Sequence, residues 1–324
     1  MADTAHLATD KELEKMERHL SAIYSRASKE IGETWKAYLA EVAKEIQPLQ
    51  DAYDAAKKSG DKDAIRKAGK KLAAAQRDKT LMDKHYKQMT EQFARELTNV
   101  NKTAIEYING KLPAVYALNY NHSATEIEFL TENAISFELV NKRAVENLVK
   151  AGDKNLLPTK KLDPKKDIPW NMKKVNSEVL QGIVQGESIP KIAKRLKNVT
   201  NASEGSAVRA ARTIVNGTEN KARHDAAENA ASKGVIMGKC WVATNDNRTR
   251  DWHAQAWADY GDKSNAVPID DPFIVNGEKM MYPGDKSASA SNVYNCRCSH
   301  KNVVKGFTSI LPPEKRGKIK VTFT

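Results

Sequence analysis

A stripe of apolar side chains between Ile65 and Ile108 constrains the fold of this chain more than any other feature. Apolar residues recur there at gaps of three and four, with lysine, arginine, aspartate and glutamate outside the stripe. This spacing places the apolar side chains on one face of an α-helix. A helix of about 45 residues is a rod roughly 70 Å long. Such a rod is not a compact domain by itself, so we predict an antiparallel helical hairpin or a coiled coil.

The residues on either side of this stripe also predict helices. A second apolar stripe covers residues 13–46, and Pro48 is expected to end or kink that helix because proline removes a backbone donor and clashes with the preceding turn. Residues 109–113, which include Gly110 and a proline, are expected to stop the rod. Ser123 fits the first position of a capping box, so a new helix is predicted to begin there.

Residues 153–172 are rich in proline and lysine and show no apolar period. This composition is typical of a linker. The alternative is an extended arm that lies on a neighbouring subunit, with Trp170 among its apolar anchors. Beyond this segment, the pattern predicts short helices at 173–185 and 188–197 and a longer helix at about 203–232.

From Val235 the apolar period changes to two, which predicts strands. Asn276 and Gly277 fit the turn of a β-hairpin, because a type I′ turn needs positive φ at both positions. A helix is expected at 248–260 and a last strand at 296–304. We therefore predict a mainly α-helical protein with a small α+β module at its C-terminal end. The predicted parts are an elongated helical region (1–152), the linker or arm (153–172), the module (173–304) and a basic tail (305–324).

The composition is that of a soluble, helix-rich protein. Apolar residues make up 40% of the 324 residues and charged residues 29%, with a mean hydropathy of −0.64. No stretch approaches the roughly 18 apolar residues of a membrane-spanning helix, and the first residues lack the basic start and apolar centre of a signal peptide. The three cysteines are an odd set, and Cys296 and Cys298 are badly spaced for a disulfide within one strand. We expect a protein without membrane association that is made and kept in a reducing cytoplasm.

Candidate metal ligands gather in the C-terminal module. Thiolate and imidazole are the usual ligands of zinc, and a structural zinc site takes four. His253, Cys296 and Cys298 are three candidates, and in a strand the two cysteines and His300 would point to one face. We favour a pair of half-buried thiols and a hydrogen-bonded histidine that hold the fold without a metal or other cofactor, and zinc is the alternative. The candidates for a fourth ligand are Cys240, Asp246 and His300.

The same stretch offers polar residues that an enzyme could use. Asp246, Arg248 and Arg250 lie close to His253 in the sequence, and a cysteine with a histidine can act as nucleophile and base. No glycine-rich oxyanion or phosphate loop accompanies them. We therefore favour a buried polar network in which Asp246 caps the following helix and pairs with an arginine, and we predict a protein that is not an enzyme.

Several short motifs follow one another in a fixed order from residue 173 to residue 304. The motifs include Gln185-Gly186-Glu187-Ser188-Ile189, Arg248-Thr249-Arg250, Tyr282-Pro283-Gly284-Asp285 and Asn295-Cys296-Arg297-Cys298. In that order and spacing the chain resembles the phage head-morphogenesis proteins related to phage Mu protein F, and the first 172 residues are not part of the resemblance. In many relatives a C-x-x-C pair occupies positions 250 and 253, where this chain has arginine and histidine. The residues expected to hold the module are Trp241, Asp246, Arg248, Arg250, His253, Pro283, Asp285, Asn295 and Arg297.

The resemblance implies a minor capsid protein that acts in head assembly and in DNA packaging or ejection. The implied partners are the portal protein, the major capsid or scaffolding protein and packaged DNA, with several copies at one vertex. The implied location is the head interior or portal vertex of the virion, after assembly in the host cytoplasm. The alternative is a DNA-binding internal or ejected virion protein, and some relatives of the module are fused to toxin enzymes.

The net charge of +12 favours a polyanionic neighbour such as nucleic acid. Acidic residues are interleaved with the basic ones, so an ordinary solvated surface is the alternative. For the tail the alternative is a solubilising segment. The candidate contacts with DNA or the portal are Lys160, Lys161, Lys165 and Lys166 in the linker and Lys315, Arg316, Lys318 and Lys320 in the tail.

Overall fold

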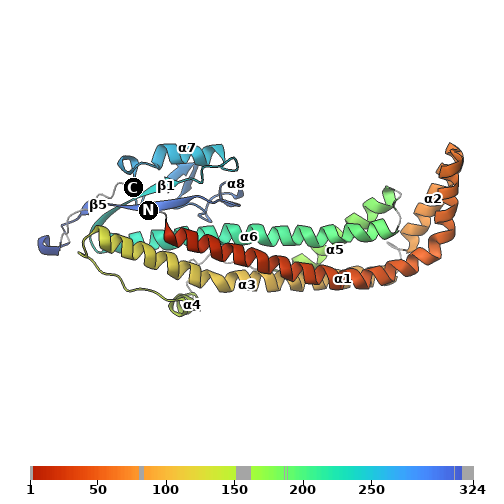
Figure 1. Cartoon of the computed structure of the whole chain (residues 1–324), viewed down its shortest axis with the longest axis horizontal. Helices are drawn as coiled ribbons and strands as arrows, with labels where there is room; N and C mark the ends of the chain where they lie inside the picture. Colours follow the sequence, from red (N-terminus) through yellow and green to blue (C-terminus); the bar gives the residue numbers. More distant parts are fainter. Residues whose placement is uncertain are drawn as a thin grey trace. The chain divides into compact units, whose positions relative to one another are not determined.

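The computed structural model describes residues 3–79, 84–150, 162–185, 187, 189–309 and 311–315. These residues are mainly helical, with a small set of strands near the C-terminal end (Figure 1), which confirms the predicted fold class. None of the helices in these ranges is both long and apolar enough to cross a membrane. The helices before the first strand are α1 (Thr4–Ser59), α2 (Lys62–Lys79), α3 (Lys84–Leu130), α4 (Lys142–Lys150), α5 (Pro164–Val184) and α6 (Ile189–Ser232).

The chain folds into two compact units. The unit that we call the sheet unit contains Met1–Glu17, Tyr107–Lys160 and Val208–Thr324, and the unit that we call the helical unit contains Arg18–Glu106 and Lys161–Ala207. Segments of α1, α3 and α6 therefore belong to each unit.

In the helical unit, α1 and α3 pair as an antiparallel hairpin. The ring of Trp35 meets those of Tyr86 and Phe93 edge-on, at centroid distances of 5.9 and 6.1 Å. Nearer the start of α1, the Tyr24 hydroxyl donates to Asn101 Oδ1 at 2.6 Å. Residue numbers rise along α1 as they fall along α3, so the pairing is antiparallel, as in the predicted hairpin. The predicted single rod at 65–108 was wrong, because α2 ends at Lys79 and α3 begins at Lys84.

Pro48, which was predicted to end or kink a helix, and Pro113, which was predicted to stop one, both lie inside helices. Pro48 is within α1, which continues to Ser59, and Pro113 is within α3, which continues to Leu130. An internal proline costs a helix about 3 kcal/mol. At Pro113 the neighbours Leu112 and Val115 are buried, and burying such side chains stabilises the helix by about 1.5–3 kcal/mol each. Tertiary packing therefore outweighs the local cost there.

The prediction that Ser123 starts a helix was wrong. Ser123 lies within α3, and its hydroxyl accepts a hydrogen bond from Asn302 Nδ2 at 3.1 Å. The predicted break between residues 197 and 203 is also absent, because α6 runs without interruption from Ile189 to Ser232.

The second half of the predicted linker is helical. Helix α5 begins at Pro164, with Asp163 at its N-cap accepting from the Lys165 amide at 3.1 Å. Asp followed by Pro is a strong helix start, because the carboxylate caps a free N–H and proline has none to leave unpaired. The linker was predicted from the proline and lysine content of the segment, and this helix start was not considered. Residues 151–161, which include the first part of the predicted linker, lie outside the described residues.

A buried polar network joins α1, α3 and α6 in the sheet unit. Arg223 donates to the Asp3 carboxylate, to Asn119 Oδ1 at 3.2 Å and to Glu219 Oε1 at 2.9 Å. His6 Nδ1 lies 2.8 Å from the same Glu219 oxygen. The network fixes the first turn of α1 against α6, with α3 beside both.

The strands of the sheet unit form two small antiparallel sheets. Strands β1 (Val235–Val242), β2 (Val267–Pro268) and β5 (Ser299–Phe307) are ordered β2-β1-β5, and they lie between α6 and α7 (Asp251–Tyr260) in Figure 1. Strands β3 (Phe273–Val275) and β4 (Glu278–Met280) form the predicted hairpin, with φ of 50° at Asn276 and 76° at Gly277. The short elements are η1 (Lys263–Asn265), α8 (Ala290–Val293) and η2 (Pro313–Lys315).

Candidate functional site

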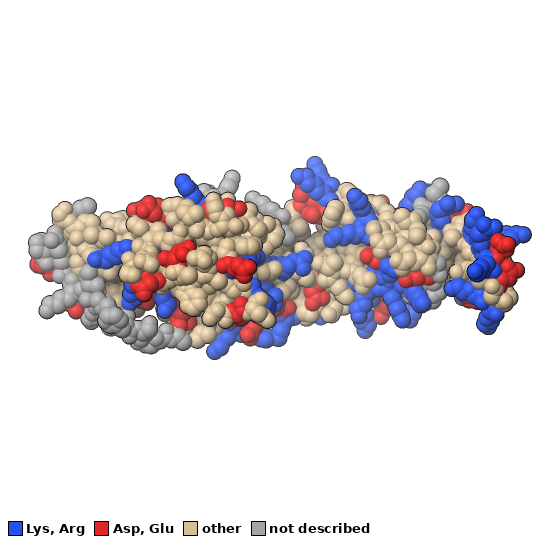
Figure 2. Space-filling model, turned by 90° about the horizontal axis from the view of Figure 1, so that it is seen from above, with Lys and Arg blue, Asp and Glu red and all other residues tan. Residues whose placement is uncertain are grey.

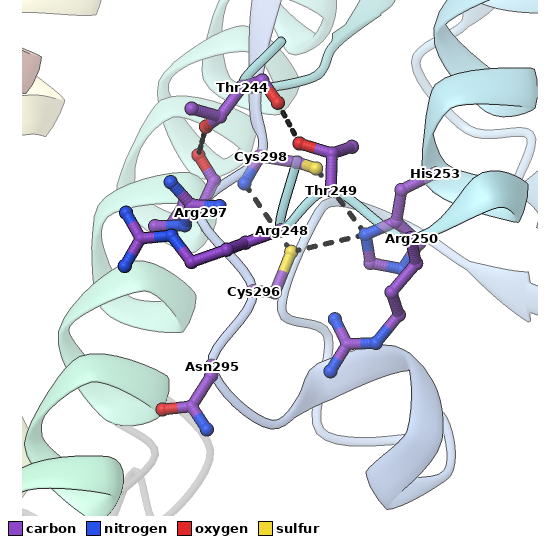
Figure 3. Close-up of a pocket in the computed structure, with 9 residues that line it drawn as sticks. All are labelled: Thr244, Arg248, Thr249, Arg250, His253, Asn295, Cys296, Arg297 and Cys298. Atoms are coloured by element: carbon purple, nitrogen blue, oxygen red, sulfur yellow. Dashed lines mark hydrogen bonds between the residues drawn. The ribbon is translucent and has the colours of Figure 1, made fainter. Parts of the chain in front are cut away.

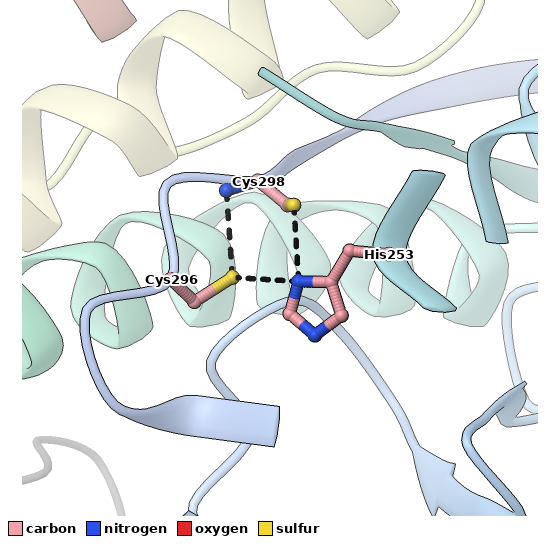
Figure 4. Close-up of side chains that lie close together, drawn as sticks. All are labelled: His253, Cys296 and Cys298. Atoms are coloured by element: carbon pink, nitrogen blue, oxygen red, sulfur yellow. Dashed lines mark hydrogen bonds between the residues drawn. The ribbon is translucent and has the colours of Figure 1, made fainter. Parts of the chain in front are cut away.

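Three buried side chains form a tight cluster: His253, Cys296 and Cys298. His253 Nδ1 lies 3.7 Å from Cys296 Sγ and 3.4 Å from Cys298 Sγ. The Cys298 amide donates to Cys296 Sγ at 3.4 Å. All three residues are at most 3% exposed, and Figure 4 shows Nδ1 of the imidazole turned toward both sulfur atoms. The cluster therefore presents two sulfur atoms and one ring nitrogen to a common centre.

Two elements bring these side chains together. His253 lies in the first turn of α7, where its amide donates to the Arg250 carbonyl at 2.9 Å. Cys296 and Cys298 lie just before β5, which begins at Ser299. The strand argument for a shared face with His300 was therefore wrong, because neither cysteine is in the strand.

The turn after β1 holds the cysteine segment in place. Thr244 Oγ1 donates to the Arg297 carbonyl at 2.9 Å. The Arg297 guanidinium forms two hydrogen bonds with the Asp246 carboxylate, at 2.6 and 2.7 Å. These hydrogen bonds hold the pKa of Asp246 well below its usual range. Asp246 also accepts from the Arg248 amide at 3.0 Å, so it caps the turn that precedes α7 and not the helix itself, which begins at Asp251.

The two thiols of the cluster have opposite pKa shifts. The hydrogen bond between them, together with burial, raises the pKa of Cys296. The same hydrogen bond, with the contact to His253, lowers the pKa of Cys298. His253 Nε2 is buried and has no hydrogen-bond partner among the described residues.

A small pocket opens beside the cluster (Figure 3). Three arginines lie around it. Arg297 is paired with Asp246, Arg250 donates to the Tyr294 carbonyl, and Arg248 has a side chain that is 70% exposed. The lining residues are Thr244, Arg248, Thr249, Arg250, His253, Asn295, Cys296, Arg297 and Cys298. The pocket thus combines two sulfurs and an imidazole at one wall with a basic rim.

Other residues predicted for the module lie around this cluster or in a separate turn. Trp241 is fully buried, and its ring meets that of His253 edge-on at 5.5 Å. Asn295 has a positive φ of 54°, and its amide donates to Thr213 Oγ1 at 3.1 Å. Pro283 and Asp285 belong to a buried turn, in which the Asp285 carboxylate accepts from the Met281 amide at 2.9 Å.

The three candidates for a fourth metal ligand do not join the cluster. Cys240 donates to the Asp262 carbonyl at 3.4 Å, and Asp246 is occupied by Arg297. His300 lies 3.1 Å from Asn220 Oδ1 through its Nδ1. Within the described ranges, only His253, Cys296 and Cys298 come together as a group of possible metal ligands in this region.

The predicted DNA or portal contacts are partly outside the described residues. Lys165 and Lys166 are exposed in the first turn of α5, and Lys166 lies 3.8 Å from Asp163. Lys315 is exposed in η2. The remaining candidates are outside the described ranges: Lys160, Lys161, Arg316, Lys318 and Lys320.

Sequence reasoning missed a buried lysine in β1. Lys239 Nζ donates to the carbonyl oxygens of Ile269 at 2.9 Å and Met281 at 2.7 Å. Burial lowers the pKa of Lys239 to about 8. One signal was available in the sequence. Alternate residues of a strand point to the same face, and Lys239 alternates with Met237 and Trp241, which are both buried. The lysine ties the loops before β3 and after β4 to the central strand.

Comparison with known proteins finds a family that this region is similar to. Residues 173–301 match the family described as Phage Mu protein F like protein. We call this part of the chain the Mu F like module, after the family that it resembles. The Mu F like module carries the whole cluster and its pocket, together with α6 and most of the sheet. No solved structure matches the chain.

Two curated relatives extend the comparison. The chain is 26% identical to the minor head protein GP7 of Bacillus phage SPP1 over 298 residues, which cover 90% of this chain and 87% of GP7. It is 28% identical over 186 residues to the NAD(+)–arginine ADP-ribosyltransferase EFV of Enterococcus faecalis, which cover 57% of this chain and 36% of that protein. The chain therefore spans little more than a third of the enterococcal relative and most of the phage one.

Proposed function

We propose that this chain is a phage minor head protein. The observation that carries the proposal is the match to the SPP1 minor head protein, which covers 90% of this chain and 87% of the relative. That match extends well beyond the Mu F like module at 173–301 into the N-terminal helices. A shared module alone is compatible with several functions, whereas a match along nearly the whole of both chains favours a shared role.

In this proposal the protein is a component of the virion head that assembles with other head proteins in the host cytoplasm. Its partners are the portal protein and the major capsid or scaffolding protein, with several copies at one vertex. The test is co-expression with the portal protein of the same genome, followed by affinity purification at moderate and high salt. We expect copurification at a fixed stoichiometry that resists salt. Virions that lack the protein entirely would contradict the proposal, and mass spectrometry of purified particles measures this directly.

We also propose that the protein acts without catalysis. The match to the ADP-ribosyltransferase covers only 36% of that enzyme, so most of the enzyme has no counterpart here. Incubation of the full chain with labelled NAD⁺ and an arginine-containing acceptor protein is expected to transfer no label. Transfer that is lost in a His253→Ala variant would establish an enzyme instead.

Contact with DNA is a second candidate function, and the charge of one segment favours it. Over residues 57–79, which include α2, lysine and arginine outnumber aspartate and glutamate by nine to three. Figure 2 shows basic side chains gathered over the segment that holds α2. Lys67, Lys70 and Lys71 are all exposed there. This cluster attracts phosphate without reading its sequence.

A salt titration separates this candidate from general basicity. We expect the affinity for linear DNA to fall with salt, and the triple variant Lys67→Glu, Lys70→Glu and Lys71→Glu to flatten the dependence by close to one unit of slope for each lost phosphate contact. The matched control changes Lys29, Lys36 and Lys44 to glutamate, which alters the net charge equally. These three lysines are exposed on α1 and are not candidate DNA contacts. Equal losses in the two triple variants would show that total charge, and not the α2 segment, determines binding.

A further inference from the structure

We propose that His253, Cys296 and Cys298 bind one zinc ion, with the fourth position open to the pocket. The ion would join the first turn of α7 to the segment that leads into β5. The inference rests on the positions of the three donor atoms, and it is independent of the proposed role in the phage head.

The donor atoms already stand at the separations that tetrahedral zinc requires. Zn–S bonds of about 2.3 Å and Zn–N bonds of about 2.0–2.1 Å, at a tetrahedral angle, place sulfur and nitrogen roughly 3.5 Å apart. The two sulfur to Nδ1 distances are 3.4 and 3.7 Å. All three donor atoms lie within 4.8 Å of one another. Both sulfur to nitrogen separations therefore match the edges of a tetrahedral zinc site.

The surroundings suit a ligand set that carries negative charge. The Cys298 amide points at Cys296 Sγ from 3.4 Å, and hydrogen bonds of this kind support metal-bound thiolates. Arginines 248, 250 and 297 line the adjoining pocket. Figure 4 shows Nδ1 of His253 facing both sulfurs. With Nδ1 bound to the ion, the proton of the imidazole would be on Nε2.

In this proposal water takes the fourth coordination position of the zinc ion. Cys240, Asp246 and His300 each have other partners, so none of these candidates supplies a ligand. The pocket reaches all three donor residues and is lined by Thr244, Thr249 and Asn295 as well. A site with three protein ligands and one exchangeable position is open to a chelator that enters from the pocket.

A bound ion would stabilise the module by closing a long segment of chain. His253 and Cys296 are separated by 43 residues, and this segment contains η1, β2, β3, β4 and α8. Since an unfolded chain has no preformed site, the free energy of metal binding adds to the free energy of unfolding. The expected consequence is a melting temperature that falls when the metal is removed.

The test uses the full chain purified without chelators or a metal-affinity tag. Elemental analysis is expected to give one zinc per chain, and a chelator is expected to lower the melting temperature until zinc is restored. Cys296→Ser and Cys298→Ser should each lose most of the zinc. The matched control is Cys240→Ser, which removes a buried thiol outside the cluster and should keep one zinc per chain. Replacement by cobalt should give absorption bands typical of thiolate coordination in the wild type and in the control.

Three results would overturn the proposal. The first is a folded wild-type chain that takes up no zinc after reduction and exposure to excess metal. The second is stoichiometric zinc that remains in both cysteine variants of the cluster. The third is a disulfide between Cys296 and Cys298 in protein purified under reducing conditions. Circular dichroism of each variant separates loss of a ligand from unfolding. A variant that has lost zinc only because it is unfolded shows a loss of helical signal.

Discussion

At the scale of single residues, Gly284 is fixed by its backbone and by α6. Its φ is +79°, and a Cβ at this position would lie 3.0 Å from the Gly217 Cα and 3.1 Å from the Gly217 nitrogen. Backbone atoms in a helix cannot move aside cheaply, so Gly284→Ala should lower the free energy of unfolding by about 1–3 kcal/mol. Denaturant titration measures the change.

The control for this substitution is Gly110→Ala. Gly110 lies inside α3 of the same unit, and nothing lies within 4 Å of a Cβ placed there. Alanine should stabilise a helix interior by about 0.5–1 kcal/mol relative to glycine. Equal destabilisation by both substitutions would contradict the role assigned to the Gly284 backbone.

Residue types, more than positions in elements, made the candidate site predictable. Cysteine and histidine are few in this chain, so His253, Cys296 and Cys298 were apparent as possible ligands before their contacts were known. His300 was misplaced because the face of a strand was assigned before the strand's first residue was known. Lys239 was missed because lysine is almost never fully buried unless its charge is paired, and its carbonyl partners come from loops that only the fold brings together.

At the scale of secondary-structure elements, Pro48 limits the stability of α1. It is exposed within the helix, so its ring removes a backbone hydrogen bond without the compensation of burial. Pro48→Ala should therefore raise the free energy of unfolding, by up to about 3 kcal/mol. Urea titration measures the free energy of unfolding, and circular dichroism checks that the helix content is kept. A loss of stability would contradict this role of Pro48.

The contact of α1 with α6 should depend on pH through His6. Its hydrogen bond to Glu219 raises the pKa of His6 above the ordinary 6.5. The charged ring therefore stabilises the fold fully below pH 6.5, and this contribution is lost as pH rises through the raised pKa. His6→Gln should lower the free energy of unfolding by about 1.5 kcal/mol at pH 6 and by less at higher pH.

Unfolding free energies measured at several pH values test this assignment. Glu219→Gln should remove the same slope, because His6 then lacks its acceptor charge. Parallel pH profiles for the wild type and His6→Gln would contradict the assignment of the pH dependence to His6.

The Asp3 carboxylate makes the same contact of α1 with α6 weaker in acid. Burial alone would raise the pKa of Asp3, but Arg223 lowers it to about 2, so this contribution is lost as pH falls from about 4 toward 2.

The helix pattern predicted the elements well and their ends poorly. Apolar spacing reports which face a helix buries, and residues such as Ile31 and Trp35 are buried as expected. Helix ends depend on whether packing outweighs a local break, and the pattern around Pro113 does not contain that information. The start of α5 is the opposite case, because the Asp163-Pro164 signal was present but a lysine-rich composition outweighed it.

At the scale of the whole molecule, the family module and the compact unit that contains much of it have different bounds. Residues 173–301 match the family, whereas the sheet unit also includes Met1–Glu17 and Tyr107–Lys160. Ile127 and Ile135 come from outside the module and share a core with Val235. The division of residues 1–152 and 173–304 into separate parts stays a prediction. A core shared by residues of both parts favours one folding unit over two.

A fragment of residues 173–324 should therefore be much less stable than the full chain. Loss of Ile127 and Ile135 removes about 1.5–3 kcal/mol of burial each, and Arg223 loses its partners Asp3 and Asn119, which costs a further 1–3 kcal/mol or so. A typical domain has a free energy of unfolding of only about 5–15 kcal/mol. We expect a fragment without a cooperative thermal transition, and recovery of the transition when residues 1–152 are added in trans. A fragment that unfolds at the same denaturant concentration as the full chain would show instead that the Mu F like module is an autonomous domain, and that the N-terminal helices only extend it.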